Sequence, residues 1–300
     1  MDQRQSLAVT STRRVLAGVG TVFDHLDAAF HSAAHRKLLA SGLVGAYLLA
    51  LGAIELSRGG HLGPALKAAL PRSHFHAVEL AFYLLLSFEV ASLVFAMAQS
   101  WANAAGKQFE IFSLILLRRS FEAFANLDEP VHWDTAQAVV LHMLADAGSA
   151  LLLFVGLGLY YAMQKHKPLS GHQDDRDSFV LAKKVIALLL LAAFGVLAGR
   201  SLWDLVHLEP AGFFEAFYTV LIFADVLVVL ISLRYNASYR VVFRNSGLAV
   251  ATVLLRLALA APPPWAGVLG MAGMLFALGL TLAYNRFEPL LDEPLPARPS

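Results

Sequence analysis

Long, uninterrupted apolar stretches are the feature that most constrains the fold of this chain. A helix needs about 20 such residues to cross the hydrocarbon core of a bilayer, and eight stretches reach or approach this length. Because they are continuous and do not alternate, they favour helices over barrel strands. Hydrophobic residues make up 58% of the chain and charged residues 15%. The stretches are 38–56, 77–98, 108–126, 138–161, 181–203, 213–233, 247–262 and 265–284.

The sequence therefore predicts an all-α integral membrane protein, a polytopic bundle of about eight transmembrane helices in a lipid bilayer. Residues 1–37 form a cytoplasmic segment, in which the apolar spacing over 11–37 predicts an amphipathic helix on the inner membrane surface. Residues 38–284 form one transmembrane domain, and 285–300 a Pro-rich cytoplasmic tail.

Lys and Arg are concentrated on alternate sides of the predicted spans. Cytoplasmic loops carry an excess of these residues. With eight crossings and both termini in the cytoplasm, 16 of the 23 Lys and Arg lie inside, three lie outside and four lie within spans. If 108–126 is interfacial, seven crossings remain and the N-terminal segment lies opposite the other basic segments. The bias favours eight crossings, and seven stays as the alternative because the apolar run before Arg118 is short.

Ionisable residues inside the spans are the first candidates for function. A charged side chain costs roughly 2.5–3.5 kcal/mol at a helix centre, so these groups should pair or line a polar route. The spacing pairs Arg118 with Glu122 along one helical face, and leaves Arg119 to find a carboxylate on another helix, for which Glu89 is the best candidate. We expect a transport pathway for protons or small cations along Glu89, Arg118, Arg119, Asp225 and Arg256. The alternative is that these residues form ion pairs that only fix helix register.

Histidines near the predicted outer side are the second set of candidates. Three helix ends there place a histidine and a carboxylate three or four residues apart, on one helical face. Such a set could hold a transition metal, a single haem or a proton site, and the alternative is interfacial anchoring. The residues are His76, Glu79, His142, Asp146, Asp204 and His207. On the inner side, Asp27, His31 and His35 share one face, where a solvated polar surface is the favoured interpretation.

Several classes of function are disfavoured. The net charge of +1 argues against a nucleic-acid partner, and the chain has no cysteine to form disulfides or thiolate metal sites. No HExxH motif is present. The favoured function is ion transport without catalysis. The alternatives are a membrane-embedded metal or haem enzyme or redox subunit, and a non-catalytic subunit of a homo-oligomer or larger membrane complex.

Small residues predict close helix packing at two places. Gly195 and Gly199 form a GxxxG pattern in the fifth stretch. Gly267, Gly270 and Gly273 recur every third residue in the last stretch. We expect both sets to lie against neighbouring helices.

Overall fold

The structure is a computed structural model that describes residues 18–60, 73–123, 130–164, 173–206, 213–235 and 239–291, with Gly63, Pro71 and Leu127. Within these residues the regular secondary structure is entirely helical. A helix over 18–30 is followed by α2 (Ala33–Arg58), α4 (Phe75–Met97), α5 (Trp101–Glu122), α6 (Trp133–Met163), α7 (Gln173–Val206), α8 (Phe213–Tyr235), α9 (Tyr239–Ala260) and α10 (Trp265–Leu291).

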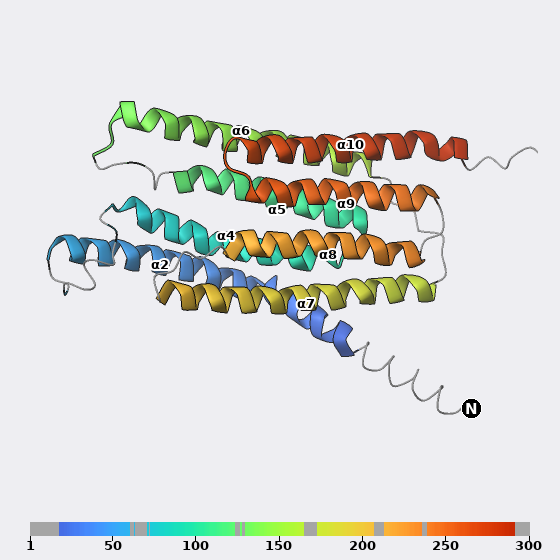
Figure 1. Ribbon diagram of the computed structural model, residues 1–300, viewed down its shortest axis with the longest axis horizontal. Helices are drawn as coiled ribbons and strands as arrows, with labels where there is room; N and C mark the ends of the chain where they lie inside the picture. Colours follow the sequence, from blue (N-terminus) through green and yellow to red (C-terminus); the bar gives the residue numbers. More distant parts are fainter. Residues whose placement is uncertain are drawn as a thin grey trace, which may run out of the picture.

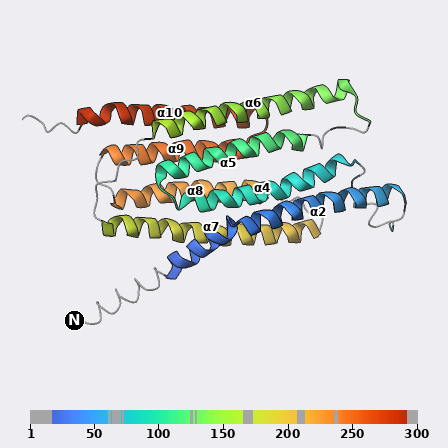
Figure 2. The same ribbon diagram turned by 180° about the vertical axis from the view of Figure 1, so that it is seen from behind.

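These long helices lie side by side along the longest axis of the molecule, and successive helices run in opposite directions (Figures 1 and 2). Residue 18 and Leu291 therefore lie at the same end of the bundle. We call this end the basic end, because Lys107, Lys184, Arg240 and Arg244 lie in the halves of α5, α7 and α9 that are nearer to it. The predicted polytopic helical bundle is confirmed.

The exposed surface of the bundle is that of a membrane protein. Large apolar side chains such as Leu49, Phe154 and Phe223 point outward and are 67–76% exposed. Three exposed tryptophans lie at the helix ends that face away from the basic end: Trp133 begins α6, Trp265 begins α10 and Trp203 is in the last turn of α7. Tryptophan collects at membrane–water interfaces because its ring is apolar and its N–H is polar. We call this end the tryptophan end.

Seven of the described helices are long and apolar enough to cross a membrane; α5 is too polar to be counted among them. Nevertheless α5 lies inside the bundle, packed against α4, α6 and α9, and Phe109, Phe112 and Leu116 are buried. Its interior position explains how it carries Gln108, since that side chain faces protein and is 2% exposed. The helix begins seven residues before the predicted 108, where Ser100 accepts a hydrogen bond from the Asn103 N–H. An interfacial position for 108–126 does not fit this packing.

The helix over 18–30 leans against the bundle at the basic end. Phe23 is buried, and its ring lies 5.7 Å from that of Phe95 on α4. Asp24 accepts a hydrogen bond from Lys184 of α7. The predicted amphipathic helix is therefore present over these residues and is broken at 31–32, and the predicted residues 11–17 lie outside the described part. At the other terminus, α10 continues past the predicted boundary at 284 to Leu291.

Candidate functional site in the bundle interior

Two ion pairs join neighbouring helices within the bundle. Arg118 of α5 pairs with Glu89 of α4. On the other side of α5, Nε of Arg256 on α9 lies 3.4 Å from the Asp225 carboxylate on α8. The side chain of Arg256 is 0% exposed and that of Asp225 is 5% exposed. Burying a guanidinium and a carboxylate is costly unless they neutralise each other, so removing one member of the Asp225–Arg256 pair would leave an uncompensated buried charge.

The first pair corrects the sequence-based pairing. Glu89 was expected to meet Arg119, and Arg118 to meet Glu122, but the carboxylate of Glu89 is held by Arg118. Arg119 instead donates to the carbonyl of Ala261, at the carboxyl end of α9, and its charge acts on Glu122. The exchange arises because adjacent residues on a helix point about 100° apart, and only one of those directions faces α4.

Arg119 is the centre of a polar cluster toward the tryptophan end. Its charge acts on Glu122 of its own helix and on Asp146 of α6, while Glu79 also acts on Glu122. Asp146 is 3% exposed, and His142 lies one turn away on the same helix. The cluster joins Arg119 of the predicted transport pathway with Asp146 of the predicted histidine and carboxylate set. We call Arg118, Arg119, Glu89, Glu122 and Asp146 the outer cluster.

Polar atoms around the second pair have unmet hydrogen-bonding capacity. Within the described part, all three guanidinium nitrogens of Arg256 and Oδ2 of Asp225 are buried without a hydrogen-bond partner. Oε1 of Gln108 on α5 also has no hydrogen-bond partner in the described part, and Gln108 is 2% exposed. Buried polar atoms nearly always have a partner in native proteins, which is often an internal water. The Asp225–Arg256 region is therefore a place where water is expected.

A narrow cavity lies beside this region. Its lining includes Gln108, Asp225, Thr252, Lys183 and Gln99. The Lys183 amine donates to the Gln99 carbonyl beyond the end of α4, and its side chain is buried. We call Lys183, Gln108, Asp225, Thr252 and Arg256 the inner cluster. A second narrow cavity, lined by Glu89, Arg118, Arg119 and Glu122, lies in the outer cluster.

Sequence reasoning missed Gln108, Thr252, Lys183 and Tyr218. Thr252 could have been found, because it lies four residues before Arg256 on the same face of α9. Tyr218 lies seven residues before Asp225, two turns away on one face of α8. Lys183 and Gln108 give no such signal, because they join the cluster only through the packing of α5 and α7 around the end of α4.

The predicted histidine sites are only partly within the described residues. His207 and the side chain of Asp204 lie outside them. In the part that is described, no three or more histidine and carboxylate side chains are grouped to hold a metal ion. Moreover, α5 packs between α4, which carries His76, and α6, which carries His142. Convergence of His76, His142 and His207 on a metal or haem stays a prediction.

The inner histidines pair locally. Nδ1 of His31 lies 2.8 Å from the Asp27 carboxylate, one helical turn away. The rings of His31 and His35 both pack against Phe30, each with its centroid 5.3 Å from that of Phe30. The helix is interrupted at residues 31–32, between Asp27 and His35.

The fold and these clusters define an integral membrane protein of helical bundle type, with charged side chains paired inside the bundle. Comparison of the chain with protein families, curated proteins and solved structures gave no match.

Proposed function

We propose that the protein is a membrane transporter or channel for protons or small cations. The observation that carries this proposal is the succession of two polar clusters inside one bundle, each containing an ion pair and a narrow cavity. Glu89, Arg118 and Arg119 belong to the outer cluster, and Asp225 and Arg256 to the inner cluster.

Unmet polar groups support transport over a purely structural role. An ion pair that served only to fix helix register would satisfy its remaining donors, because each unsatisfied buried group costs about 1–3 kcal/mol. Arg256 instead leaves three nitrogens without a partner in the described part of the chain. Groups held in this state are suited to binding water or an ion that passes through.

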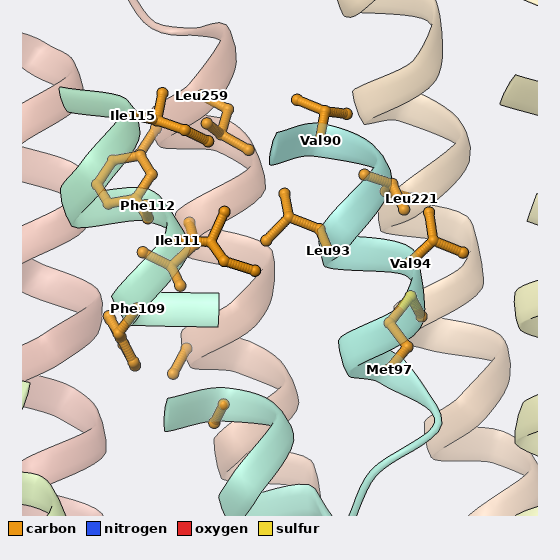
Figure 3. Packing of buried hydrophobic residues seen from close by; sticks show 14 of the residues in the cluster. Val90, Leu93, Val94, Met97, Phe109, Ile111, Phe112, Ile115, Leu221 and Leu259 are labelled. Carbon is orange, nitrogen blue, oxygen red and sulfur yellow. The ribbon is translucent and has the colours of Figure 1, made fainter. Parts of the chain in front are cut away.

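Packed apolar side chains lie between the outer cluster and the inner cluster. Leu93 of α4 points toward Ile111 of α5, Val90 lies one turn away on α4, and Leu259 of α9 lies beside Ile115 of α5 (Figure 3). All five are buried. A hydrophobic constriction of this kind blocks the flow of ions when it is dry. The proposed transport therefore requires either a movement of α4 against α5 or a route around this packing.

Basic residues at one end support an orientation for transport. The end that carries Lys107, Lys184, Arg240 and Arg244 would face the cytoplasm under the charge rule for membrane proteins, and the tryptophan end would face outward. Both termini would then be cytoplasmic. The outer cluster would exchange ions with the outside and the inner cluster with the cytoplasm.

Ion flux in liposomes containing the purified full chain tests the proposal. Proton movement is followed with an internal pH-sensitive dye, and Na⁺ and K⁺ movement with ion-selective dyes, under an imposed gradient. We expect wild-type flux above that of empty liposomes and a loss of about tenfold or more in Asp225→Asn, in line with the effect of removing a positioned proton-transfer group. Glu215→Gln is the matched control, because Glu215 lies on the same helix but is exposed.

Folding of each variant is checked by thermal unfolding and size-exclusion chromatography in detergent. If Asp225→Asn fails to fold, Glu89→Gln replaces it. Flux of no ion above empty liposomes, from folded wild-type protein, would contradict the proposal and leave the ion pairs as structural links between helices.

A further inference from the structure

Lys183 of α7 is a buried lysine whose amine contacts groups that favour a positive charge. Lys183 is 4% exposed, and its amine donates to the carbonyl of Gln99, an exposed residue in the connection between α4 and α5. The amine also lies over the ring of Phe179, 5.3 Å from the ring centroid. A carbonyl oxygen and the face of an aromatic ring both attract a cation. These contacts stabilise the lysine ammonium inside the protein.

The end of α4 adds to this preference for a cation. The carboxyl end of a helix carries a partial negative charge, and α4 ends at the basic end. The last turn of α4 contains no basic residue of its own. Lys183 supplies the positive charge from α7, which packs against α4. If this were its whole role, Lys183 would stabilise the protein and have no effect on which ions pass.

Lys183 also shares a cavity with the buried carboxylate of the inner ion pair. Both Lys183 and Asp225 line this cavity, which has room for about one water molecule. Oδ2 of Asp225 and Oε1 of Gln108, two residues of the lining, have no hydrogen-bond partner in the described part. Water has two O–H donors for these acceptors and can itself accept a hydrogen bond from the lysine amine. The lining is therefore suited to a single water that bridges Asp225 and Lys183.

The charges around this cavity disfavour a metal cation. Asp225 already has Arg256 beside it, with Oδ2 and Nε 3.4 Å apart. With Lys183, the site therefore contains one carboxylate and two cations. A Na⁺ or K⁺ ion in the cavity would meet the ammonium, and repulsion between like charges is strong where little water screens it. The small cavity also leaves no room for the several oxygen ligands that must replace a hydration shell.

We propose that Lys183 determines the ion selectivity of the inner cluster: its ammonium excludes Na⁺ and K⁺ and transfers protons between Asp225 and the basic end. This inference rests on the proposed transport function, and it names the proton as the transported species. A metal ion must pass the ammonium, whereas a proton can pass through it, because a buried lysine can lose its proton and regain one.

The proton transfer balances in the following way. The ammonium of Lys183 releases a proton from Nζ to water at the basic end and becomes a neutral amine. The amine lone pair then takes a proton from the water in the cavity, and that water takes the proton of the neutral Asp225 carboxyl group. Asp225 becomes a carboxylate and Lys183 is again an ammonium. The net result is that one proton moves from Asp225 to the basic end.

Two substitutions of Lys183 separate its charge from its ability to transfer a proton. Lys183→Gln removes the charge, and we expect Na⁺ flux in proteoliposomes to rise about tenfold or more above the wild type, because the repulsion is lost. Lys183→Arg keeps the charge, but a guanidinium does not release its proton. It should still exclude Na⁺ and K⁺, and its proton flux should fall about tenfold or more.

Lys184→Gln is the matched control. Lys184 is the adjacent residue, but its amine pairs with Asp24 at 2.7 Å and it is not in the lining of the inner cavity. Its proton and Na⁺ fluxes should equal those of the wild type. The main readout is the ratio of proton flux to Na⁺ flux under equal driving force, which does not depend on how much protein is inserted. Loss of a helix cap alone would lower the midpoint of thermal unfolding and leave this ratio unchanged.

The outcomes distinguish this inference from the proposed function. Wild-type flux of Na⁺ or K⁺ equal to that of protons would preserve transport and overturn the selectivity. An unchanged flux ratio in folded Lys183→Gln would overturn it as well, and if this variant does not fold, the wild-type ratio and Lys183→Arg still decide. Wild-type proton flux in Lys183→Arg would overturn the transfer through Lys183. Absence of any flux from folded wild-type protein would overturn both the selectivity and the proposed function.

Discussion

Asp225 of α8 and Arg256 of α9 face each other with Oδ2 and Nε 3.4 Å apart, and both side chains are almost completely buried. The geometry brings the charges together without completing hydrogen bonds, since Oδ2 of Asp225 and all three nitrogens of Arg256 have no partner in the described part. The attraction therefore depends on both charges being present, and this dependence can be measured.

Removing either member of this pair should destabilise the protein strongly. Arg256→Leu or Asp225→Asn alone leaves the other group buried without its counter-charge, and we expect the free energy of unfolding to fall by about 3–5 kcal/mol. The double variant should lose less than the sum of the two. Reversible unfolding in detergent with increasing denaturant measures these values.

The control for this cycle is Glu110→Gln. Glu110 pairs with Lys107 on the same helix at 2.6 Å, but both side chains are more than a third exposed. We expect a change of roughly 0–1 kcal/mol, as for exposed pairs. Strictly additive effects of Asp225→Asn and Arg256→Leu would show that the two charges do not stabilise each other.

The choice between the two adjacent arginines of α5 is also testable. A double-mutant cycle between Glu89→Gln and Arg118→Gln should give a coupling energy within about 0.5–3 kcal/mol, the range for residues in contact. The same cycle with Arg119→Gln should give a smaller value, because Arg119 donates to the Ala261 carbonyl instead. A larger coupling of Glu89 with Arg119 than with Arg118 would refute the pairing seen here.

The helices themselves were predictable from the sequence, because lipid contact demands long apolar stretches. The ends of the helices were not predictable. The helix α5, for example, includes the polar residues Asn103 and Lys107, which precede its apolar stretch. The identity of the charged residues was also predictable, because an ionisable residue in a span is conspicuous. Which charges meet depends on which helices are neighbours and how each is rotated, and spacing along one helix contains neither fact.

The glycines also show that spacing along one helix does not reveal which face of the helix meets a neighbour. Gly267, Gly270 and Gly273 were expected to allow close packing, and they do lie against Ser149, Phe112 and the Ala251 carbonyl. Gly195 and Gly199 had the same expected role from their GxxxG spacing, but a Cβ at either position would meet nothing within 4 Å. The pattern alone does not tell which face of α7 is turned toward the bundle.

This difference predicts opposite effects of the same substitution. A Cβ at Gly267 would lie 2.6 Å from the Cβ of Ser149, which cannot rotate away, so α6 and α10 must shift apart. We expect Gly267→Ala to cost about 1–3 kcal/mol of stability, as for overpacked cores. Gly199→Ala should be neutral or stabilise by up to about 1 kcal/mol, because alanine has the higher helix propensity. Equal effects in thermal unfolding would contradict the packing of α10 on α6.

The crossing of the membrane by α5 is best tested by labelling, because the chain has no native cysteine to remove. Single cysteines at Gln99, Val131 and Tyr239 lie on exposed residues, before α5, after α5 and at the start of α9. With eight crossings and cytoplasmic termini, a membrane-impermeant maleimide added to intact cells should label Val131→Cys. It should label Gln99→Cys and Tyr239→Cys only after the membrane is opened with detergent. If α5 lay along the interface instead, positions 99 and 131 would be labelled from the same side, whichever side that is. The comparison within this pair therefore decides whether the polar, buried helix at the centre of the bundle crosses the membrane.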